Sequence, residues 1–231
     1  MPADTNTTVL ERVIKTLGFA RVELERLYVP FISVEGVDGS GKTEQVRRLV
    51  EHLRSAGLKV LQTKEPDGGH LGAEVRSMLT RPDRVLDAAE QLLLISAARF
   101  DHVRSVIRPA LEQGQWVVSD RFIDSTYAFQ VAVSERSLHA MFRSVGEVVV
   151  GSTYPELTII LDLPPKVAHC RRALRSDGVE DPAEATRDFA AIRNGLLGLA
   201  QEDPERCRLI NADQPVDAVA KDIWSLVEPL L

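Results

Sequence analysis

The chain has 231 residues, of which 28 are Lys or Arg and 34 are Asp or Glu, so its formal net charge is −6. This negative charge argues against a general binder of nucleic acid or of anionic membranes. Two cysteines are too few for a disulfide framework, the first residues form no secretory signal, and the longest apolar runs are too short to span a bilayer. We therefore expect a cytoplasmic protein whose partners are neither nucleic acids nor membranes.

The N-terminal part of the chain predicts an amphipathic helix. Between Thr8 and Leu27, apolar residues recur at every third or fourth position, with charged residues between them. We expect residues 1–29 to form a helical extension and residues 30–231 to form the main domain.

After this extension, short apolar strands alternate with helical patterns. Strands are predicted at residues 31–35, 59–63, 116–119, 157–162 and 208–211, and helices at residues 42–56, 71–80, 87–113, 124–145, 165–175 and 183–200, with a last helix ending near Leu231. Continuous apolar strands that alternate with helices are typical of a parallel sheet covered on both faces. The predicted fold class is therefore α/β, with five parallel strands and helices on both faces.

A glycine-rich loop lies between the first of these strands and the helix that follows it. Its residues fit the pattern G-x-x-x-x-G-K-[ST]: Gly36, Val37, Asp38, Gly39, Ser40, Gly41, Lys42 and Thr43. In such a loop, backbone N–H groups and the start of the helix bind phosphate. Lys42 supplies positive charge and the Thr43 hydroxyl coordinates Mg²⁺. The loop predicts a P-loop NTPase-type fold that binds ATP and Mg²⁺. The alternative is a helix capped after a glycine turn, with an incidental lysine.

Two charged residues, Asp120 and Arg121, end the third predicted strand. Open α/β sheets bind ligands at this edge. We expect Asp120 to act in the shell of the Mg²⁺ ion and Arg121 to bind phosphate oxygens, because phosphoryl transfer depends on positioned cations. The alternative is that Asp120 caps the next helix and Arg121 pairs with a surface acid.

Five segments in order resemble the thymidylate kinase family of P-loop nucleoside monophosphate kinases. They are residues 31–43 (FISVEGVDGSGKT), 63–68 (TKEPDG), 92–99 (LLLISAAR), 119–130 (SDRFIDSTYAFQ) and 157–165 (LTIILDLPP). The resemblance implies an enzyme that transfers the γ-phosphate of ATP to dTMP, giving dTDP and ADP in dTTP synthesis. It also implies a homodimer.

The same resemblance assigns the residues that bind the acceptor nucleotide. Asp38 is expected at the sugar 3′-hydroxyl, and Arg99 and Arg121 at the nucleotide and its phosphate. Ile95 stands where the family usually has a Phe that stacks on thymine. The predicted acceptor-binding residues are Asp38, Glu65, Pro66, Ile95, Arg99, Arg121, Ser125, Thr126, Phe129 and Gln130, with Ser125, Thr126 and Gln130 on the wall that reads the base and Glu65–Pro66 in a turn that members often build with a cis proline.

The segment after the fourth strand resembles the family's lid, at about residues 169–185. Arg171 and Arg175 are four positions apart, which predicts that they share one face of a helix. They match the arginines that bacterial-type members bring over the ATP phosphates, while Gly39 occupies the loop position where other members place an arginine. Together with Lys42 and Arg121, they are the residues expected to act in catalysis. A solvated basic helix face is the alternative.

Departures from the family pattern leave other functions open. Ile95 and the altered segment after Gln130 are compatible with a P-loop kinase for another nucleoside monophosphate. The altered lid is compatible with a nucleotide-binding module that has little turnover.

Overall fold

The structure is a computed structural model that describes residues 29–132, 134–174 and 187–231. The predicted N-terminal helix falls outside these residues, as does most of the predicted lid. In the part of the chain that is described, no helix is long and apolar enough to cross a membrane.

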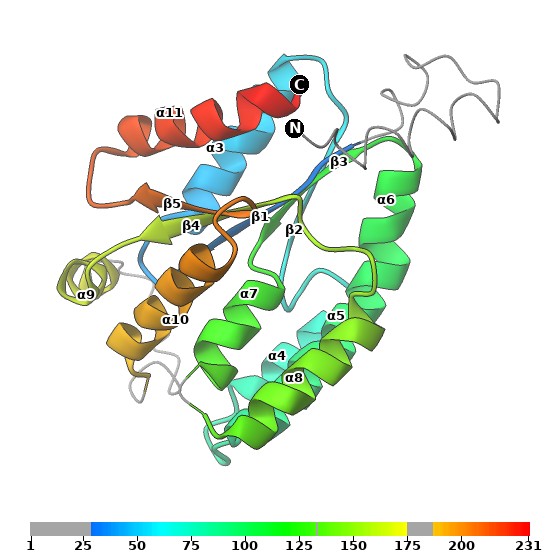
Figure 1. The fold of residues 1–231 in the computed structure, drawn as a ribbon, viewed down its shortest axis with the longest axis vertical. Coiled ribbons are helices and arrows are strands. Elements are labelled where there is room, and N and C mark those ends of the chain that lie inside the picture. Colours follow the sequence, from blue (N-terminus) through cyan, green and yellow to red (C-terminus); the bar gives the residue numbers. More distant parts are fainter. Residues whose placement is uncertain (1–28, 133, 175–186) are drawn as a thin grey trace, which may run out of the picture.

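Five parallel strands form one sheet at the centre of the fold (Figure 1). They are β1 (Phe31–Gly36), β2 (Val60–Lys64), β3 (Trp116–Asp120), β4 (Leu157–Asp162) and β5 (Cys207–Asn211), in the order β2-β3-β1-β4-β5. The predicted α/β class and five-stranded parallel sheet are confirmed, and each strand lies within one residue of its predicted bounds. Because β1 is central, the loop that follows it opens beside the ends of β3 and β4.

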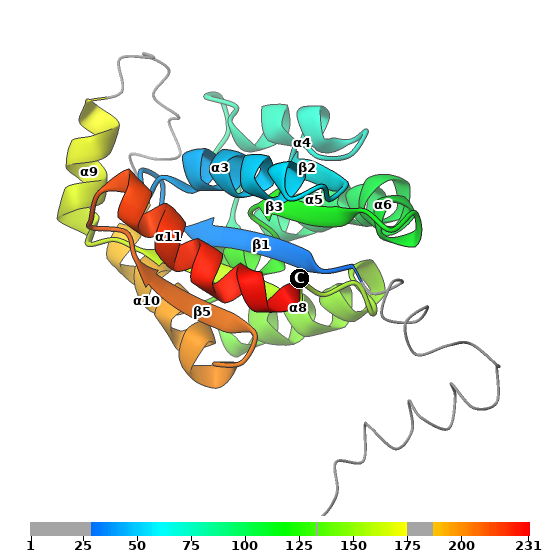
Figure 2. The ribbon, with the colours of Figure 1, turned by 90° about the horizontal axis from the view of Figure 1, so that it is seen from above.

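Helices cover both faces of the sheet. They are α3 (Lys42–Ser55), α4 (Gly72–Leu79), α5 (Ala88–His102), α6 (Arg108–Glu112), α7 (Ile123–Thr126), α8 (Arg136–Val149), α9 (Pro165–Ala173), α10 (Phe189–Glu202) and α11 (Val216–Val227), with the π-helical turns η1 (Val103–Ile107) and η2 (Tyr127–Val131) and a terminal 3₁₀ turn, η4 (Glu228–Leu230). In Figure 1, α3 and α11 lie above the sheet and α7, α8 and α10 below it, and Figure 2 looks onto the α3 and α11 side.

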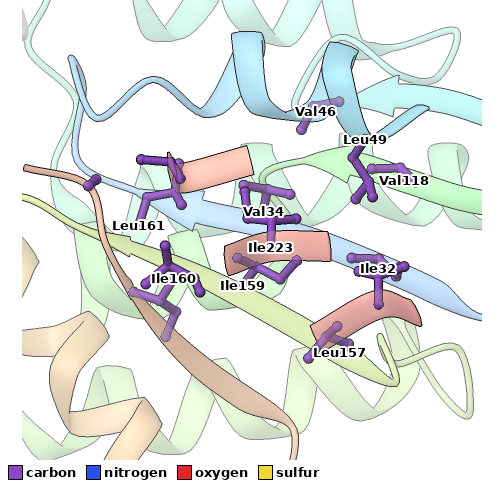
Figure 3. Packing of buried hydrophobic residues seen from close by; sticks show 14 of the residues in the cluster. Ile32, Val34, Val46, Leu49, Val118, Leu157, Ile159, Ile160, Leu161 and Ile223 are labelled. Carbon is purple, nitrogen blue, oxygen red and sulfur yellow. The ribbon is translucent and has the colours of Figure 1, made fainter. Parts of the chain in front are cut away.

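The alternation of side chains along β1 divides the core between these two faces. Ile32 and Val34 pack with residues of α3 and α11, including Ile223, as Figure 3 shows. Phe31 points to the opposite face and packs edge-on against Phe122. With a period of two, Glu35 lies on the same face as Phe31, toward α7.

The helical pattern over residues 124–145 is confirmed except for one interruption, so it is not a single continuous helix. The chain forms α7 and η2, then breaks before α8. In η2, the Ala132 N–H donates to the carbonyl of Tyr127, five residues earlier, and Ser134 caps the carbonyl of Val131 with both its N–H and its hydroxyl. This capping ends the first helix, so that α8 starts a new direction at Arg136.

The long helix predicted over residues 87–113 is present as α5, η1 and α6, which follow one another without a break. Asp87 starts it with a capping box, because its side chain accepts from the Glu90 N–H while Glu90 accepts from the Asp87 N–H. The π turn in the middle precedes Pro109, which has no N–H to donate to the preceding turn.

Candidate active site

The phosphate loop joins β1 to α3 at the carboxyl edge of the sheet. Lys42 is buried, and its Nζ donates to the Val37 carbonyl at 3.0 Å and lies 3.9 Å from Asp38 Oδ1. Burial, together with repulsion from Arg121, lowers the pKa of Lys42 to about 8, although nearby carboxylates oppose the shift. The ammonium group of Lys42 thus lies against the backbone of the loop and close to Asp38.

Gly39 is the point where the phosphate loop touches α9. Its φ is +90°, and a Cβ atom there would lie 2.7 Å from the carbonyl oxygen of Ala168. Both the backbone conformation and the contact require glycine. No arginine fits at this loop position unless α9 moves.

Thr43 and Asp120 meet at the start of α3. The Thr43 hydroxyl donates to Asp120 Oδ2 at 2.6 Å. Asp120 therefore faces the phosphate loop and does not cap α7, whose N-cap is Phe122 without a side-chain bond. Both groups are hard oxygen ligands of the kind Mg²⁺ prefers, so the donor set fits that ion. Within the described residues, no group of three or more His, Cys, Asp or Glu could hold a metal.

A cavity of about 660 Å³ lies beside the phosphate loop. All ten residues predicted to bind the acceptor line it: Asp38, Glu65, Pro66, Ile95, Arg99, Arg121, Ser125, Thr126, Phe129 and Gln130. The segment between α4 and α5 forms part of its wall, together with Arg76, Gln91 and Arg187. The ten predicted residues come from four separate segments of the chain and are thus gathered around one space.

Asp38 is held by two guanidinium groups at the border between the loop and this cavity. Arg121 Nη2 donates to its Oδ1, and Arg187 Nη1 donates to its Oδ2 at 3.1 Å. Burial raises the pKa of Asp38, but the attraction of Arg121, Lys42 and Arg187 outweighs this effect and lowers it to about 2. Asp38 is therefore ionised at neutral pH. Arg121 pairs with this carboxylate of the phosphate loop, and not with a surface acid as the alternative interpretation had it.

Arg121 faces both the phosphate loop and the cavity. Its Nη1 donates to the Gly36 carbonyl at 3.2 Å and to the Ser125 hydroxyl at 2.9 Å. Its guanidinium carbon lies 4.8 Å from the centre of the Phe129 ring. Its backbone is left-handed, with φ of 74°, which is unusual for a residue with a side chain. Arg121 is thus fixed from several sides at the junction of the two spaces.

Arg99 is buried deep in the wall of the cavity. Its Nε and Nη2 both donate to Glu65 Oε2, at 2.8 and 2.6 Å, and Nη2 also donates to the Thr126 hydroxyl at 2.9 Å. The peptide bond between Glu65 and Pro66 is cis, as predicted. Through its two hydrogen bonds with Arg99, Glu65 fixes the orientation of the guanidinium.

Two glutamines that line the cavity form a directed chain of hydrogen bonds. Gln91 Nε2 donates to the Leu86 carbonyl at 2.8 Å, so Gln91 Oε1 is the group that accepts from Gln130 Nε2, at 3.0 Å. The buried Gln130 Oε1 has no hydrogen-bond partner among the described residues. A carbonyl can only accept, so Gln130, which lines the cavity, holds a buried acceptor without a partner in its wall.

The predicted lid is described only in part. Arg171 is on α9, and its Nη2 donates to the carbonyl of Ala212, just after β5, at 3.0 Å. Its neighbour Arg172 stacks on the Phe189 ring at 3.8 Å. The helix ends at Ala173, two residues before its predicted end, and Arg175 lies outside the described residues. Its placement with Arg171 stays a prediction.

Three residues of the site were not identified from the sequence. Glu35 was visible as a carboxylate in an otherwise apolar strand, and it contacts Ser125 and the backbone of Phe122. Gln91 and Arg187 belong to no motif: Gln91 lies in the first turns of α5, and Arg187 lies just before α10. Only the fold brings them to the cavity.

Comparisons with known proteins agree with this geometry. A family model described as thymidylate kinase matches residues 34–223. The chain is 42% identical over 201 residues to a thymidylate kinase of Magnetococcus marinus, covering 86% of this chain and 95% of that protein. It is 40% identical over 202 residues to one of Pseudomonas fluorescens, covering 87% and 96%. The crystal structure of a thymidylate kinase from Ehrlichia chaffeensis matches with a TM-score of 0.67 at 29% identity, covering 86% and 98%. The chain belongs to the thymidylate kinase family.

Proposed function

We propose that this protein transfers the γ-phosphate of ATP to dTMP, giving dTDP and ADP for dTTP synthesis. Family membership supports this reaction, as does the position of the cavity directly beside the phosphate loop. The two spaces meet at Asp38 and Arg121, where an acceptor phosphate in the cavity would approach a nucleoside triphosphate on the loop.

The observation that carries the choice of acceptor is that Gln130 lines the cavity and its buried Oε1 has no hydrogen-bond partner among the described residues, so that its side chain would turn this oxygen toward a bound base. Thymine has an N–H at ring position 3, which can donate to this oxygen. Cytosine has an unprotonated nitrogen there, which would leave two acceptors facing each other. A site built to bond a donor rejects an analogue that lacks it more strongly than an apolar pocket does.

Phosphoryl transfer is then catalysed mainly by positioned positive charge. Lys42 moves from its intraloop bonds to the β- and γ-phosphates of ATP, while Arg121 binds the acceptor phosphate and Asp38 the sugar 3′-hydroxyl. Arg99 holds the acceptor from the far wall. The lid residues Arg171 and Arg175 complete the cationic shell over the ATP phosphates and exclude water as the lid closes.

Thr43 and Asp120 are the residues that would hold Mg²⁺. When bound with ATP, the ion neutralises charge on the β- and γ-phosphates. Because the protein offers two oxygen ligands at this point, the site suits an ion that keeps several waters and is bound largely through its substrate.

We further propose a cytoplasmic homodimer without nucleic acid or membrane partners. Large apolar side chains are exposed on neighbouring helices, among them Met78 on α4, Leu93 and Phe100 on α5 and Val148 on α8. Light scattering coupled to size exclusion tests the assembly, because a dimer has twice the mass of the chain. A monomer at micromolar concentration would contradict it.

The decisive experiment measures ADP release from ATP with dTMP, dUMP, dCMP, dGMP and UMP as acceptors. We expect dTMP to be the best acceptor and dCMP to be poor, with Lys42→Ala as the inactive control. If another nucleotide is phosphorylated faster than dTMP, that nucleotide is the substrate and the proposed acceptor is wrong. ATP binding without turnover of any acceptor would indicate a binding module instead of a kinase.

A further inference from the structure

We propose that Glu35 is a positioning residue that holds both the backbone and the guanidinium of Arg121, and thereby aims this arginine at the acceptor phosphate. The inference rests on the proposed phosphotransferase function for its kinetic consequence, but its structural part stands without it. Glu35 itself lies behind Arg121, is fully buried, and is not among the residues that line the cavity.

One oxygen of Glu35 fixes the backbone. The Phe122 N–H donates to Glu35 Oε1 at 2.7 Å, which anchors the peptide that follows Arg121. The preceding peptide is anchored too, since the Arg121 N–H donates to the Val34 carbonyl at 3.0 Å. Between these anchors Arg121 adopts its φ of 74°, a conformation that costs a non-glycine residue about 1–2 kcal/mol. Strain of this kind persists only where surrounding contacts hold it.

The other oxygen of Glu35 fixes the side chain. The Ser125 hydroxyl donates to Glu35 Oε2, and the same hydroxyl oxygen accepts from Arg121 Nη1 at 2.9 Å. Ser125 thus connects the carboxyl group to the guanidinium. A single buried side chain on β1 therefore sets the direction of Arg121 at two points, at the peptide that follows it and, through Ser125, at its guanidinium.

The local environment does not favour a carboxyl group at this position. Burial raises the pKa of Glu35 to about 8, and the nearby Asp124 carboxylate adds to the effect, while the bond from Ser125 and the attraction of Arg121 oppose it. An apolar side chain would suit a fully buried strand position better. What a carboxyl group offers here is two oxygens in a fixed geometry, one bonded to the Phe122 N–H and the other to the Ser125 hydroxyl, and both contacts serve Arg121.

The test compares Glu35→Leu, which removes both bonds, with Glu35→Gln, which keeps an oxygen for the Phe122 N–H and a polar group for Ser125. Thr158→Val is the matched control. Thr158 is also fully buried and is bonded to Asp124, next to Ser125 in α7, but makes no contact with Arg121. For each variant, kcat, the KM of each substrate and the midpoint of thermal unfolding are measured.

We expect Glu35→Leu to lower kcat about 100-fold, because a displacement of about 1 Å at a reacting group has an effect of this size. The KM for dTMP should rise while the KM for ATP stays within twofold, and Glu35→Gln should recover most of kcat. Thr158→Val should lower thermal stability but keep kcat. Two outcomes would contradict a positioning role and leave Glu35 with a structural role only. One is an equal loss of kcat in Glu35→Leu and Thr158→Val at equal stability, and the other is no recovery of kcat in Glu35→Gln.

Crystal structures of the wild type and the two Glu35 variants give a second readout that is independent of activity. In Glu35→Leu we expect Arg121 to leave the left-handed region and to lose its contact with Asp38, and in Glu35→Gln to keep both. An unchanged Arg121 in the Leu variant overturns the inference. If Glu35→Leu does not fold, Ser125→Ala cuts the guanidinium contact alone, and an unmoved guanidinium there overturns it equally. If the wild type phosphorylates no nucleotide, the proposed function fails and these structures alone decide on Glu35.

Discussion

The hydroxyl of Thr43 donates a 2.6 Å hydrogen bond to Oδ2 of Asp120, across 77 positions of the sequence. The bond joins the start of α3 to the end of β3, and it brings two oxygen ligands together. Two elements that carry different motifs are therefore preorganised as one site.

Asp120→Asn should weaken the use of Mg²⁺. The amide keeps an oxygen but removes the negative charge that attracts the ion, so the Mg²⁺ concentration for half-maximal rate should rise about tenfold. Titration of Mg²⁺ at saturating ATP and dTMP measures the effect. Asp222→Asn, an exposed residue on α11, is the control. An unchanged titration in Asp120→Asn would mean that Asp120 does not serve the ion.

Gln130→Leu should reduce the discrimination between bases. Leucine removes the amide of Gln130 from the wall of the cavity, so the KM for dTMP should rise about tenfold and the preference for dTMP over dCMP should fall. Steady-state kinetics with both nucleotides give the ratio, and Gln113→Leu, an exposed glutamine outside the cavity, is the comparison. A constant preference would assign the reading of the base to other residues.

Arg187→Ala should affect the acceptor more than ATP. Arg187 binds Asp38 Oδ2 at 3.1 Å and lines the cavity. Its loss leaves Asp38 held on one side only, and we expect the KM for dTMP to rise about tenfold with little change in the KM for ATP. Arg193→Ala is the matched control, because Arg193 is on α10 and pairs with Asp162 outside the cavity. Similar kinetics in both variants would exclude an acceptor role for Arg187.

Two glycine substitutions should have opposite effects on stability. Gly39→Ala forces a side chain into a left-handed position 2.7 Å from the Ala168 carbonyl, so it should lower the free energy of unfolding by about 1 kcal/mol or more and weaken ATP binding. Gly198 is inside α10 with nothing within 4 Å of a Cβ atom, and Gly198→Ala should raise the free energy by about 0.5–1 kcal/mol. Denaturant titration measures both. Equal tolerance at the two positions would contradict the tight contact between the loop and α9.

Glu35 should make stability depend on pH. Its pKa is about 8 in the folded protein, against 4.5 for an exposed glutamate. Between these values the unfolded chain releases a proton that the folded protein keeps, so stability falls as pH rises from about 4.5 to 8 and is level outside this range. Glu35→Gln lacks this dependence. The free energy of unfolding of the wild type should therefore decrease relative to the variant from pH 5 to pH 8, and a constant difference would mean that Glu35 ionises normally.

The strands and the phosphate loop were predictable because their signals are local. A strand such as β4 is apolar along nearly its whole length since it is covered on both faces, and the loop is one contiguous motif. The acceptor residues were placed by resemblance, and the structure gathers them in one cavity. The residues between α7 and α8 suit a helix by composition, and only the bonds of Ser134 to the Val131 carbonyl reveal the break.

The remaining residues of the site depend on three-dimensional neighbours. Arg187 contacts Asp38, which lies 149 positions earlier in the sequence. The sequence around Arg187 carries no motif. The acidic character of Glu35 was visible in the sequence, but its contacts with Phe122 and Ser125 depend on how α7 packs on β1. Such relations are absent from any short window of residues.

At position 121, the residue that would be best for stability differs from the residue that the reaction needs, because the backbone of Arg121 is left-handed. Glycine would adopt the same φ without steric cost and would favour the folded state. It would also remove the guanidinium that joins Asp38 to the cavity. In a lineage that no longer needed the reaction, drift toward glycine, asparagine or aspartate at position 121 would relax the fold. Arg121→Gly is therefore expected to raise the stability of the fold while it removes the charge that acts on the acceptor.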